Sequence, residues 1–304
     1  MNDRIPIVLK ADGDCAYAEA LAAHLKTALL HTTPDAPVWL SVNAAGLSLT
    51  DGDQAMRGDF TKLQKRLQYH NLTHELLVKA TKVKGRENLR VIDATAGMGE
   101  DSLLLAAAGC EVTLYEQDPV IAALLQDTMR RALEEATLHE IVMRMQLVEG
   151  DSIDHLRRLG EAGTGSDAPE DDAGHACPAL TASAATGNGA DASTSGAEVT
   201  TNDAAATTNS ADEALKRPDV IYLDPMFPER QKSGLVKKKF QLIHYLEAPA
   251  ENEEALMQAA IAAQPFKIVV KRPAKGPYLA GLKPSYSLDG KAIRYDCYVF
   301  PENV

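Results

Sequence analysis

The sequence has no long apolar run, and cysteine is scarce in it. No stretch approaches the roughly 20 apolar residues that span a bilayer, and the opening residues MNDRIPIVLK lack the apolar segment of a signal peptide. The four cysteines, Cys15, Cys110, Cys177 and Cys297, are scattered without CxxC or other metal-like spacing. We therefore expect a cytoplasmic protein with reduced thiols, no metal site and no membrane segment.

The phosphate-binding GxGxxG motif is also absent, although a related turn is present. Leu89 to Asp101 reads LRVIDATAGMGED, which predicts a short buried strand, the acid Asp93, a turn with Gly97 and Gly99, and the start of an amphipathic helix. Glycine lets a ligand approach the backbone closely, and amides at a helix start can donate to ligand oxygens. The stretch is typical of a cofactor site.

The acids around this turn indicate the kind of ligand. A pyrophosphate prefers bare amides in a positive field, whereas a turn flanked by Asp93, Glu100 and Asp101 suits a cationic ligand without phosphate. S-adenosylmethionine (SAM), with its ammonium and sulfonium, is such a ligand, and we favour it over NAD. The next expected strand, Glu111–Glu116, ends about 20 residues after the turn, where dinucleotide folds bind ribose, so Glu116 is the predicted ribose ligand.

A third strand is expected at Met145–Val148, after a helix at Pro119–Ala136. Ligands of open α/β sheets lie at the carboxyl ends of the strands, so Asp151 and Ser152 are placed to meet the adenine edge. Alternatively, one of them caps a helix at Ile153–Leu159, and the two roles are compatible.

The first 56 residues are predicted to form a small α/β subdomain. Its expected elements are strands at Ile5–Leu9, Val38–Asn43 and Leu47–Thr50 and a helix at Cys15–Leu30. Residues 57–88 are assigned to a basic helical connector, and residues 89–304 to the main domain.

The connector is basic in an acidic protein. Between Arg57 and Arg90 there are nine Lys or Arg and three acids. Helices are expected at Thr61–Gln68 and at Thr73–Thr81, the second capped by Asn71 or by Thr73 itself. These charges either contact phosphates or form a solvated helix face, and the composition does not decide between the two.

Residues 161–214 differ from the rest in composition. They are Ala, Thr, Ser, Gly, Asp and Asn with ten acids, no Lys or Arg and almost no large apolar residue, so we expect a disordered insertion. Its charge of −10 leaves about −2 of the chain's −12 for the folded remainder. The overall acidity therefore does not exclude a nucleic-acid substrate.

After the insertion the strand–helix alternation resumes. The expected elements are strands at Asp219–Leu223 and Phe266–Lys271, helices at Leu235–Leu246 and Glu251–Ala263, and a final hairpin of Ser285–Leu288 with Ile293–Phe300. The whole pattern predicts an α/β fold with a doubly wound, mostly parallel seven-stranded sheet of the class I methyltransferase type and an antiparallel edge.

A second motif follows the strand at Asp219–Leu223. Asp224-Pro225-Met226-Phe227 resembles the (Asn/Asp)-Pro-Pro-(aromatic) signature of enzymes that methylate planar nitrogens. The lone pair of such a nitrogen is spread into its ring, so a carboxylate and a carbonyl must accept its two hydrogens and orient it. Asp224 and the Pro225 carbonyl suit this role, with Phe227 stacking on the base. The structural alternative is an Asp-Pro turn with a packed Phe227.

The two motifs together resemble a known family. VIDATAGMGEDSLLLAAAGCEVTLYEQDPVIAALL and VIYLDPMFPERQKSGLVKK are similar to RsmJ, the guanine-N2 methyltransferases of small-subunit (16S) ribosomal RNA. The resemblance implies a SAM-dependent enzyme acting on ribosomal RNA or the small ribosomal subunit. It also implies that seven residues contact SAM or frame its site, namely Glu100, Asp101, Glu116, Gln117, Asp151, Ser152 and Asp224.

Basic residues follow the second motif. We expect the RNA backbone to be held by Arg230, Lys232, Lys237, Lys238 and Lys239.

Other interpretations of the function are an amino-methyltransferase acting on a DNA base or a protein glutamine, and a SAM-binding protein without turnover. No target-recognition domain is visible in the sequence, which disfavours DNA.

Overall fold

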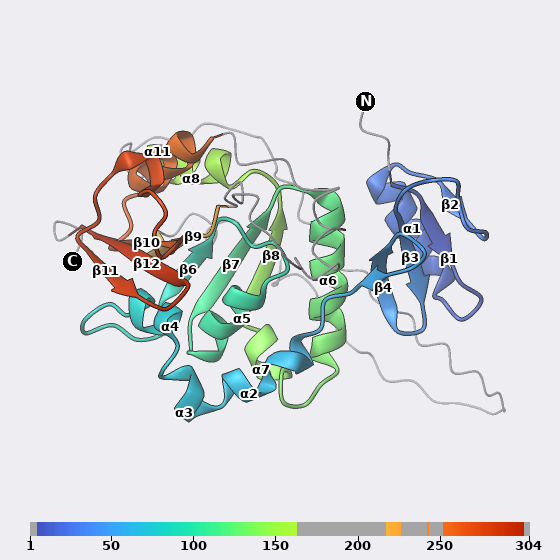
Figure 1. Cartoon of the computed structure of the whole chain (residues 1–304), viewed down its shortest axis with the longest axis horizontal. Helices are drawn as coiled ribbons and strands as arrows, with labels where there is room; N and C mark the ends of the chain where they lie inside the picture. The colour runs from blue at the N-terminus through green and yellow to red at the C-terminus, as the bar shows by residue number, and fades with distance from the viewer. Residues whose placement is uncertain (1–4, 163–216, 226–241, 243–251, 301–304) are drawn as a thin grey trace, which may run out of the picture. The chain divides into compact units, whose positions relative to one another are not determined.

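The largest element of the fold is a seven-stranded sheet, shown in Figure 1. The computed structural model describes residues 5–162, 217–225, 242 and 252–300. In sheet order β11-β12-β10-β9-β6-β7-β8, the strands are Tyr286–Asp289, Ile293–Val299, Lys267–Pro273, Val220–Leu223, Arg90–Asp93, Glu111–Glu116 and Met145–Glu149.

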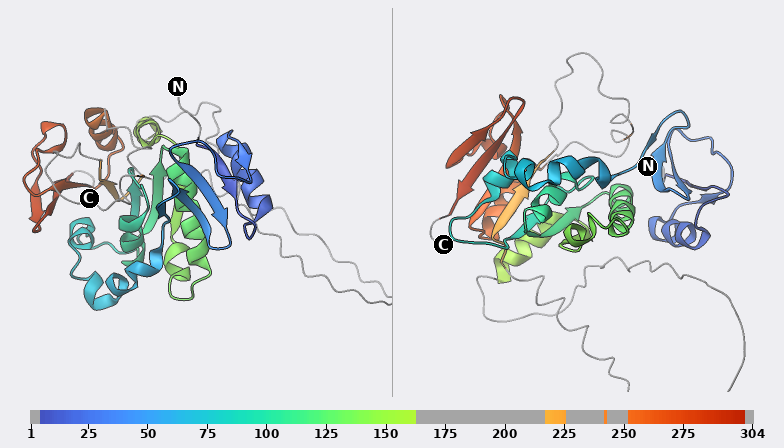
Figure 2. Two further views of the ribbon diagram at one scale, coloured as in Figure 1. Left: turned by 45° about the vertical axis from the view of Figure 1, so that its right-hand side comes forward. Right: turned by 90° about the horizontal axis from the view of Figure 1, so that it is seen from below.

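The pairing of these strands confirms the expected fold class. β10, β9, β6, β7 and β8 are parallel, whereas β12 runs antiparallel to both β10 and β11. The β11–β12 hairpin forms one edge of the sheet (Figure 2). The strand of this sheet that comes first in the sequence, β6, lies between β7 and β9, so the carboxyl ends of β6 and β9 are neighbours. Ligands of doubly wound sheets bind at such a reversal of strand order.

Apolar residues alternate between the two faces of the sheet. Val91 of β6 packs with the cluster that holds α5 (Glu100–Ala107), while Ile92 packs with α8 (Ser152–Ala162) and α11 (Glu253–Ala262). A strand's side chains point alternately to either face, so both faces are buried beneath helices. Helices α6 (Pro119–Leu133) and α7 (His139–Val142) and the short η2 (Leu279–Gly281) complete this part of the chain.

A second sheet precedes the first in the chain. Its order is β2-β1-β3-β4-β5, with strands at Leu29–Leu30, Ile7–Leu9, Trp39–Asn43, Gly46–Thr50 and Ala55–Met56. Helix α1 (Cys15–Leu25) ends earlier than the predicted Leu30, which is a correction. Lys26 has the left-handed φ of 51° and its backbone N–H bonds back to the last turn, after which Leu29 and Leu30 pair with β1.

The connector also differs from prediction. Instead of two helices it contains η1 (Phe60–Leu63), α2 (Gln64–Leu67), α3 (Tyr69–Leu72) and α4 (Leu76–Thr81). The expected caps Asn71 and Thr73 are wrong, because α4 follows Glu75 and has no side-chain cap.

Several basic side chains of the connector have protein partners. Arg66 Nε lies 2.8 Å from a Glu75 oxygen, and Arg86 Nη1 lies 3.1 Å from an Asp219 oxygen. Arg57 donates to Asn43 Oδ1. These arginines therefore hold segments of the protein together, in addition to any contact with a ligand.

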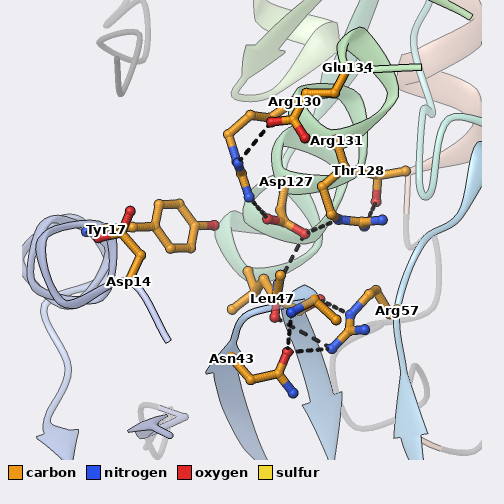
Figure 3. Close-up of polar contacts among 12 residues, drawn as sticks. Asp14, Tyr17, Asn43, Leu47, Arg57, Asp127, Thr128, Arg130, Arg131 and Glu134 are labelled. Atoms are coloured by element: carbon orange, nitrogen blue, oxygen red, sulfur yellow. Dashed lines mark hydrogen bonds and ion pairs between the residues drawn. The ribbon is translucent and has the colours of Figure 1, made fainter. Parts of the chain in front are cut away.

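The N-terminal sheet contacts the main sheet through helix α6. Buried Asp127 of α6 accepts a hydrogen bond from the backbone N–H of Leu47 in β4, as Figure 3 shows. One apolar cluster also joins residues of the N-terminal sheet to Leu124 of α6, Met98 and Leu242. The N-terminal sheet is therefore anchored close to the turn that follows β6.

Three further expectations concern the chain as a whole. None of the helices that the structure describes is long and apolar enough to cross a membrane. Cys15, Cys110 and Cys297 are free thiols. From residue 163 on, the expected insertion lies outside the described residues, and so does Cys177.

Candidate functional site

Asp93 ends β6 and joins the strand to the helix that follows the turn. Its side chain is buried, with Oδ2 accepting from Ser102 Oγ at 2.5 Å and Oδ1 accepting from the Thr95 backbone N–H at 3.1 Å. Burial raises the pKa of Asp93 to about 7, although both hydrogen bonds act in the opposite direction. Through these two hydrogen bonds Asp93 stabilises the turn and the start of the helix that follows it.

The two glycines of the turn have different surroundings. Both have a positive φ, 52° at Gly97 and 73° at Gly99, which glycine adopts without strain. A Cβ atom on Gly99 would lie 2.6 Å from Leu125 Cδ1, whereas one on Gly97 would meet no atom of the described residues within 4 Å. Gly99 is thus needed for packing, and Gly97 faces open space where a ligand can approach the backbone.

Glu116 lies at the end of β7 beside this turn. Its Oε2 accepts from the Gly97 N–H at 2.9 Å and its Oε1 from the Asp118 N–H at 2.8 Å. Burial raises the pKa of Glu116, against the effect of these backbone hydrogen bonds. Each carboxylate oxygen has two acceptor sites, so Glu116 can still accept from a ribose hydroxyl.

The end of β8 reaches the same edge of the sheet. Glu149 of β8 lies opposite Glu116 of β7 in the register of the parallel strands, and the Gly150 N–H donates to the Glu116 backbone carbonyl. Asp151 Oδ1 accepts from the Ile153 N–H at 2.8 Å, which is the predicted capping role. Ser152 is buried, and the adenine contact of these two residues stays a prediction.

Asp224 follows β9 and is tied to the same turn. Its backbone N–H donates to Thr95 Oγ1 at 2.7 Å, and the Ala94 N–H donates to the Tyr222 carbonyl at 3.0 Å. Pro225 is buried. The structure therefore brings the start of the second motif to the first. Six residues named from the sequence lie outside the described residues, namely Phe227, Arg230, Lys232, Lys237, Lys238 and Lys239.

A lysine that sequence reasoning missed connects the two motifs. Lys271 Nζ donates to Asp101 Oδ2 at 2.7 Å and to Asp224 Oδ2 at 2.8 Å, and Tyr222 donates its hydroxyl to the same Asp101 oxygen at 2.6 Å. A signal existed, because Lys271 interrupts the apolar run at the end of its strand. Val270 of β10 pairs with Leu223, which places Lys271 beside Asp224.

The charges of this group influence one another. Burial raises the pKa of Asp224, and the adjacent Lys271 opposes that effect. Burial would lower the pKa of Lys271, but the Asp101 and Asp224 carboxylates outweigh it and raise that pKa. Lys271 is therefore an ammonium at neutral pH.

The residues at this edge of the sheet fit SAM. Acidic side chains end β6, β7 and β9 or begin α5, and this excess of carboxylates suits a ligand with two cationic centres. The open space at Gly97 leaves room at the backbone. Glu100 and Gln117 are exposed at the same edge. In the described part of the chain, no three His, Cys, Asp or Glu residues are grouped as a metal site would require.

Comparison with known proteins agrees with this geometry. A family model described as SAM-dependent methyltransferase matches residues 23–165 and 190–300. Ribosomal RNA small subunit methyltransferase J of Thioalkalivibrio sulfidiphilus is 36% identical, with 98% of this chain and 99% of the relative covered. Its namesake from Pseudomonas aeruginosa is 34% identical, with 94% and 91% covered.

A solved structure shows the same arrangement over nearly the whole length. The SAM-dependent methyltransferase of Neisseria gonorrhoeae superimposes with a TM-score of 0.65 at 25% identity, and covers 97% of this chain and 95% of its own. The chain belongs to the ribosomal RNA small subunit methyltransferase J family of SAM-dependent methyltransferases.

Proposed function

We propose that this protein transfers a methyl group from SAM to the exocyclic N2 amine of a guanosine in small-subunit ribosomal RNA. One observation carries the proposal: the Asp224 backbone is hydrogen-bonded to Thr95 in the cofactor turn, at 2.7 Å. An acceptor for an amine thus lies beside the expected position of the cofactor. The names of the relatives supply the RNA substrate, and such a substrate would place the protein in the cytoplasm.

Asp224 and Pro225 would orient the amine. The Asp224 carboxylate and the Pro225 carbonyl each accept one N–H, so that the nitrogen lone pair faces the methyl group. SAM, when bound, supplies the methyl group and the sulfur leaving group. On sequence grounds Phe227 would stack on the guanine, a contact worth roughly 1 to 3 kcal/mol.

The remaining roles are also proposals. Glu116 would bind the ribose hydroxyls, Asp151 and Ser152 the adenine edge, and Glu100, Asp101 and Gln117 would frame the site. The basic residues between Arg230 and Lys239 would hold the RNA backbone. The support for this role comes from the sequence alone.

Methylation of ribosomal RNA from a strain that lacks the gene tests the function directly. The purified protein is incubated with radiolabelled SAM and either naked RNA or small subunits, and digested RNA is examined for N2-methylguanosine by mass spectrometry. Asp224→Ala should lose turnover at least about 100-fold while RNA binding persists, because Asp224 orients one amine and does not grip the RNA. Asp53→Asn, at an exposed turn of the N-terminal sheet, is the matched control.

Other products would redirect the assignment. Label in DNA bases or in protein glutamine, but not in RNA, would support another planar nitrogen as the target. Calorimetric binding of SAM without transfer to any of these substrates would support a non-catalytic SAM-binding protein.

A further inference from the structure

Lys271 stands between two acidic residues that come from different elements. Asp101 belongs to the first turn of α5, Asp224 follows β9, and Lys271 reaches both from β10. All three side chains are partly buried, with exposed fractions of 20% for Asp101, 37% for Asp224 and 24% for Lys271. The ion pairs are thus partly shielded from water.

The two carboxylates require a cation at this position. Both Oδ2 atoms contact the same nitrogen, so they are close neighbours in a partly buried setting. Two like charges in such a setting cannot both stay ionised at neutral pH without a compensating charge, and a protonated carboxyl loses acceptor capacity. Lys271 supplies that charge.

The contacts also leave one carboxylate oxygen available. Asp224 Oδ2 is taken by Lys271, and within the described part of the chain no group donates to Asp224 Oδ1. Tyr222 and Lys271 both donate to Asp101 Oδ2, which fixes the position of the ammonium. The orientation of Asp224 is therefore set from the Oδ2 side only.

We propose that Lys271 is a positioning residue of the methyl-transfer site, which holds Asp224 charged and turned so that Oδ1 accepts the N–H of the target amine. The inference rests on the proposed function for its target but on the contacts of Lys271 for its mechanism. Lys271 does not act as a base, because it already carries its proton between two carboxylates.

Other charged and titratable groups face Asp224. Burial raises the pKa of Asp224, Lys271 lowers it, Asp101 raises it, and Arg272 lowers it. Within the described residues, the groups of β6, α5, β9, β10 and β12 that interact electrostatically with Asp224 include Asp93, Asp101, Tyr222, Lys271, Arg272 and Tyr295. Removing Lys271 and removing the Asp101 charge should therefore move the pKa of Asp224 in opposite directions.

A carboxyl titration of the cofactor-free protein tests this without any substrate. The Asp224 signal is followed by carbon NMR of aspartate-labelled protein and identified by its loss in Asp224→Asn. Lys271→Met should raise the titration midpoint by about one pH unit or more, Asp101→Asn should lower it, and Lys271→Arg should leave it close to wild type. Lys275→Met, at an exposed lysine just after β10, is the matched control.

Kinetics on ribosomal RNA provide the second measurement. Lys271→Met should lower kcat about 10- to 100-fold with KM for RNA changed less than about twofold, and should move the acidic limb of the pH profile to higher pH. Lys271→Arg should recover most of the lost rate.

The outcomes separate this inference from the proposed function. An unchanged Asp224 midpoint in both Lys271→Met and Asp101→Asn would overturn the inference, whatever the activity. An equal loss of kcat in the Met and Arg variants, with no change in the pH profile, would also overturn it. If wild-type protein does not methylate RNA while the midpoints move as expected, the proposed function is wrong and the role of Lys271 toward Asp224 stands.

Discussion

The Gly97 backbone N–H donates to Glu116 Oε2 at 2.9 Å, so the turn after β6 is fixed to the end of β7. The two residues are 19 positions apart in the chain. Because Asp224 bonds to Thr95 of the same turn, three strand ends meet around one short segment. At Gly97 this segment faces open space, whereas Gly99 lies against Leu125. The roles of the two glycines can therefore be tested separately.

Gly97→Ala should lower the affinity for SAM and should cost little stability. Its left-handed φ should cost about 1 kcal/mol of unfolding free energy, and the new methyl group would project into the space proposed for the cofactor. We expect the SAM Kd to rise about tenfold in calorimetry, because backbone approach is lost.

Gly99→Ala is the matched comparison on the same turn. Its Cβ would lie 2.6 Å from Leu125 Cδ1, and Leu125 is fully buried, so the variant should lose about 2 to 3 kcal/mol of unfolding free energy. Equal losses of SAM affinity at equal stability in both variants would contradict the distinct roles assigned to the two glycines.

The fold was largely predictable from the sequence because strand and helix patterns are local. The seven strands of the main sheet carry apolar runs or alternation, and strand ends such as Asp93 and Asp224 follow directly from them. The strands β2 and β5 were missed because two residues carry too little pattern. The predicted helix at Cys15–Leu30 was too long. Leu29 and Leu30 pair with β1 in the sheet, although the spacing of the apolar residues favours a helix there.

The site was only partly predictable, because some of its contacts join distant parts of the chain. Lys271 meets Asp224 across 47 positions and Asp101 across 170. No local pattern encodes such pairs; they follow from the order of strands in the sheet. Likewise, the Thr95 hydroxyl is placed near Asp224 only because β6 and β9 are neighbours.

Asp93 should make stability depend on pH. Its folded-state pKa of about 7 lies above the usual carboxyl value near 4. Between these values the folded protein keeps the proton that the unfolded chain has lost. The contribution of Asp93 to unfolding free energy is therefore complete below pH 4 and is lost as pH rises through about 7.

Urea unfolding of Asp93→Asn checks this sign. From pH 4 to pH 8 the wild type should lose stability relative to the variant, on the order of a few kcal/mol. Titrating groups that do not interact with Asp93, such as Glu116, are present in both proteins and cancel in the difference, whereas Asp101 and Asp224 interact with Asp93 and add a smaller change of their own. Glu111→Gln, at the exposed start of β7, should run parallel to wild type. Parallel curves for Asp93→Asn as well would show that Asp93 is ionised in the folded protein.

Asp127 should be essential for attaching the N-terminal sheet to α6. Its side chain is fully buried and accepts from Arg130 Nη2 at 2.9 Å, Arg131 Nε at 2.8 Å and the Leu47 N–H at 3.0 Å (Figure 3). Asp127→Ala would leave the Leu47 N–H without its acceptor and Arg131 without its anion. Removing one partner of such a buried group costs about 3 to 5 kcal/mol, measured as unfolding free energy in urea.

Glu134 provides the control for Asp127 on the same helix and around the same arginine. Glu134 is 73% exposed and lies 3.8 Å from Arg130 Nη1, so Glu134→Ala should cost less than about 0.5 kcal/mol. Asp127→Asn should fall between the two, because an amide oxygen can still accept from Leu47 but carries no charge for the arginines. A loss in Asp127→Ala no larger than that in Glu134→Ala would mean that apolar packing, rather than Asp127, attaches the N-terminal sheet to α6.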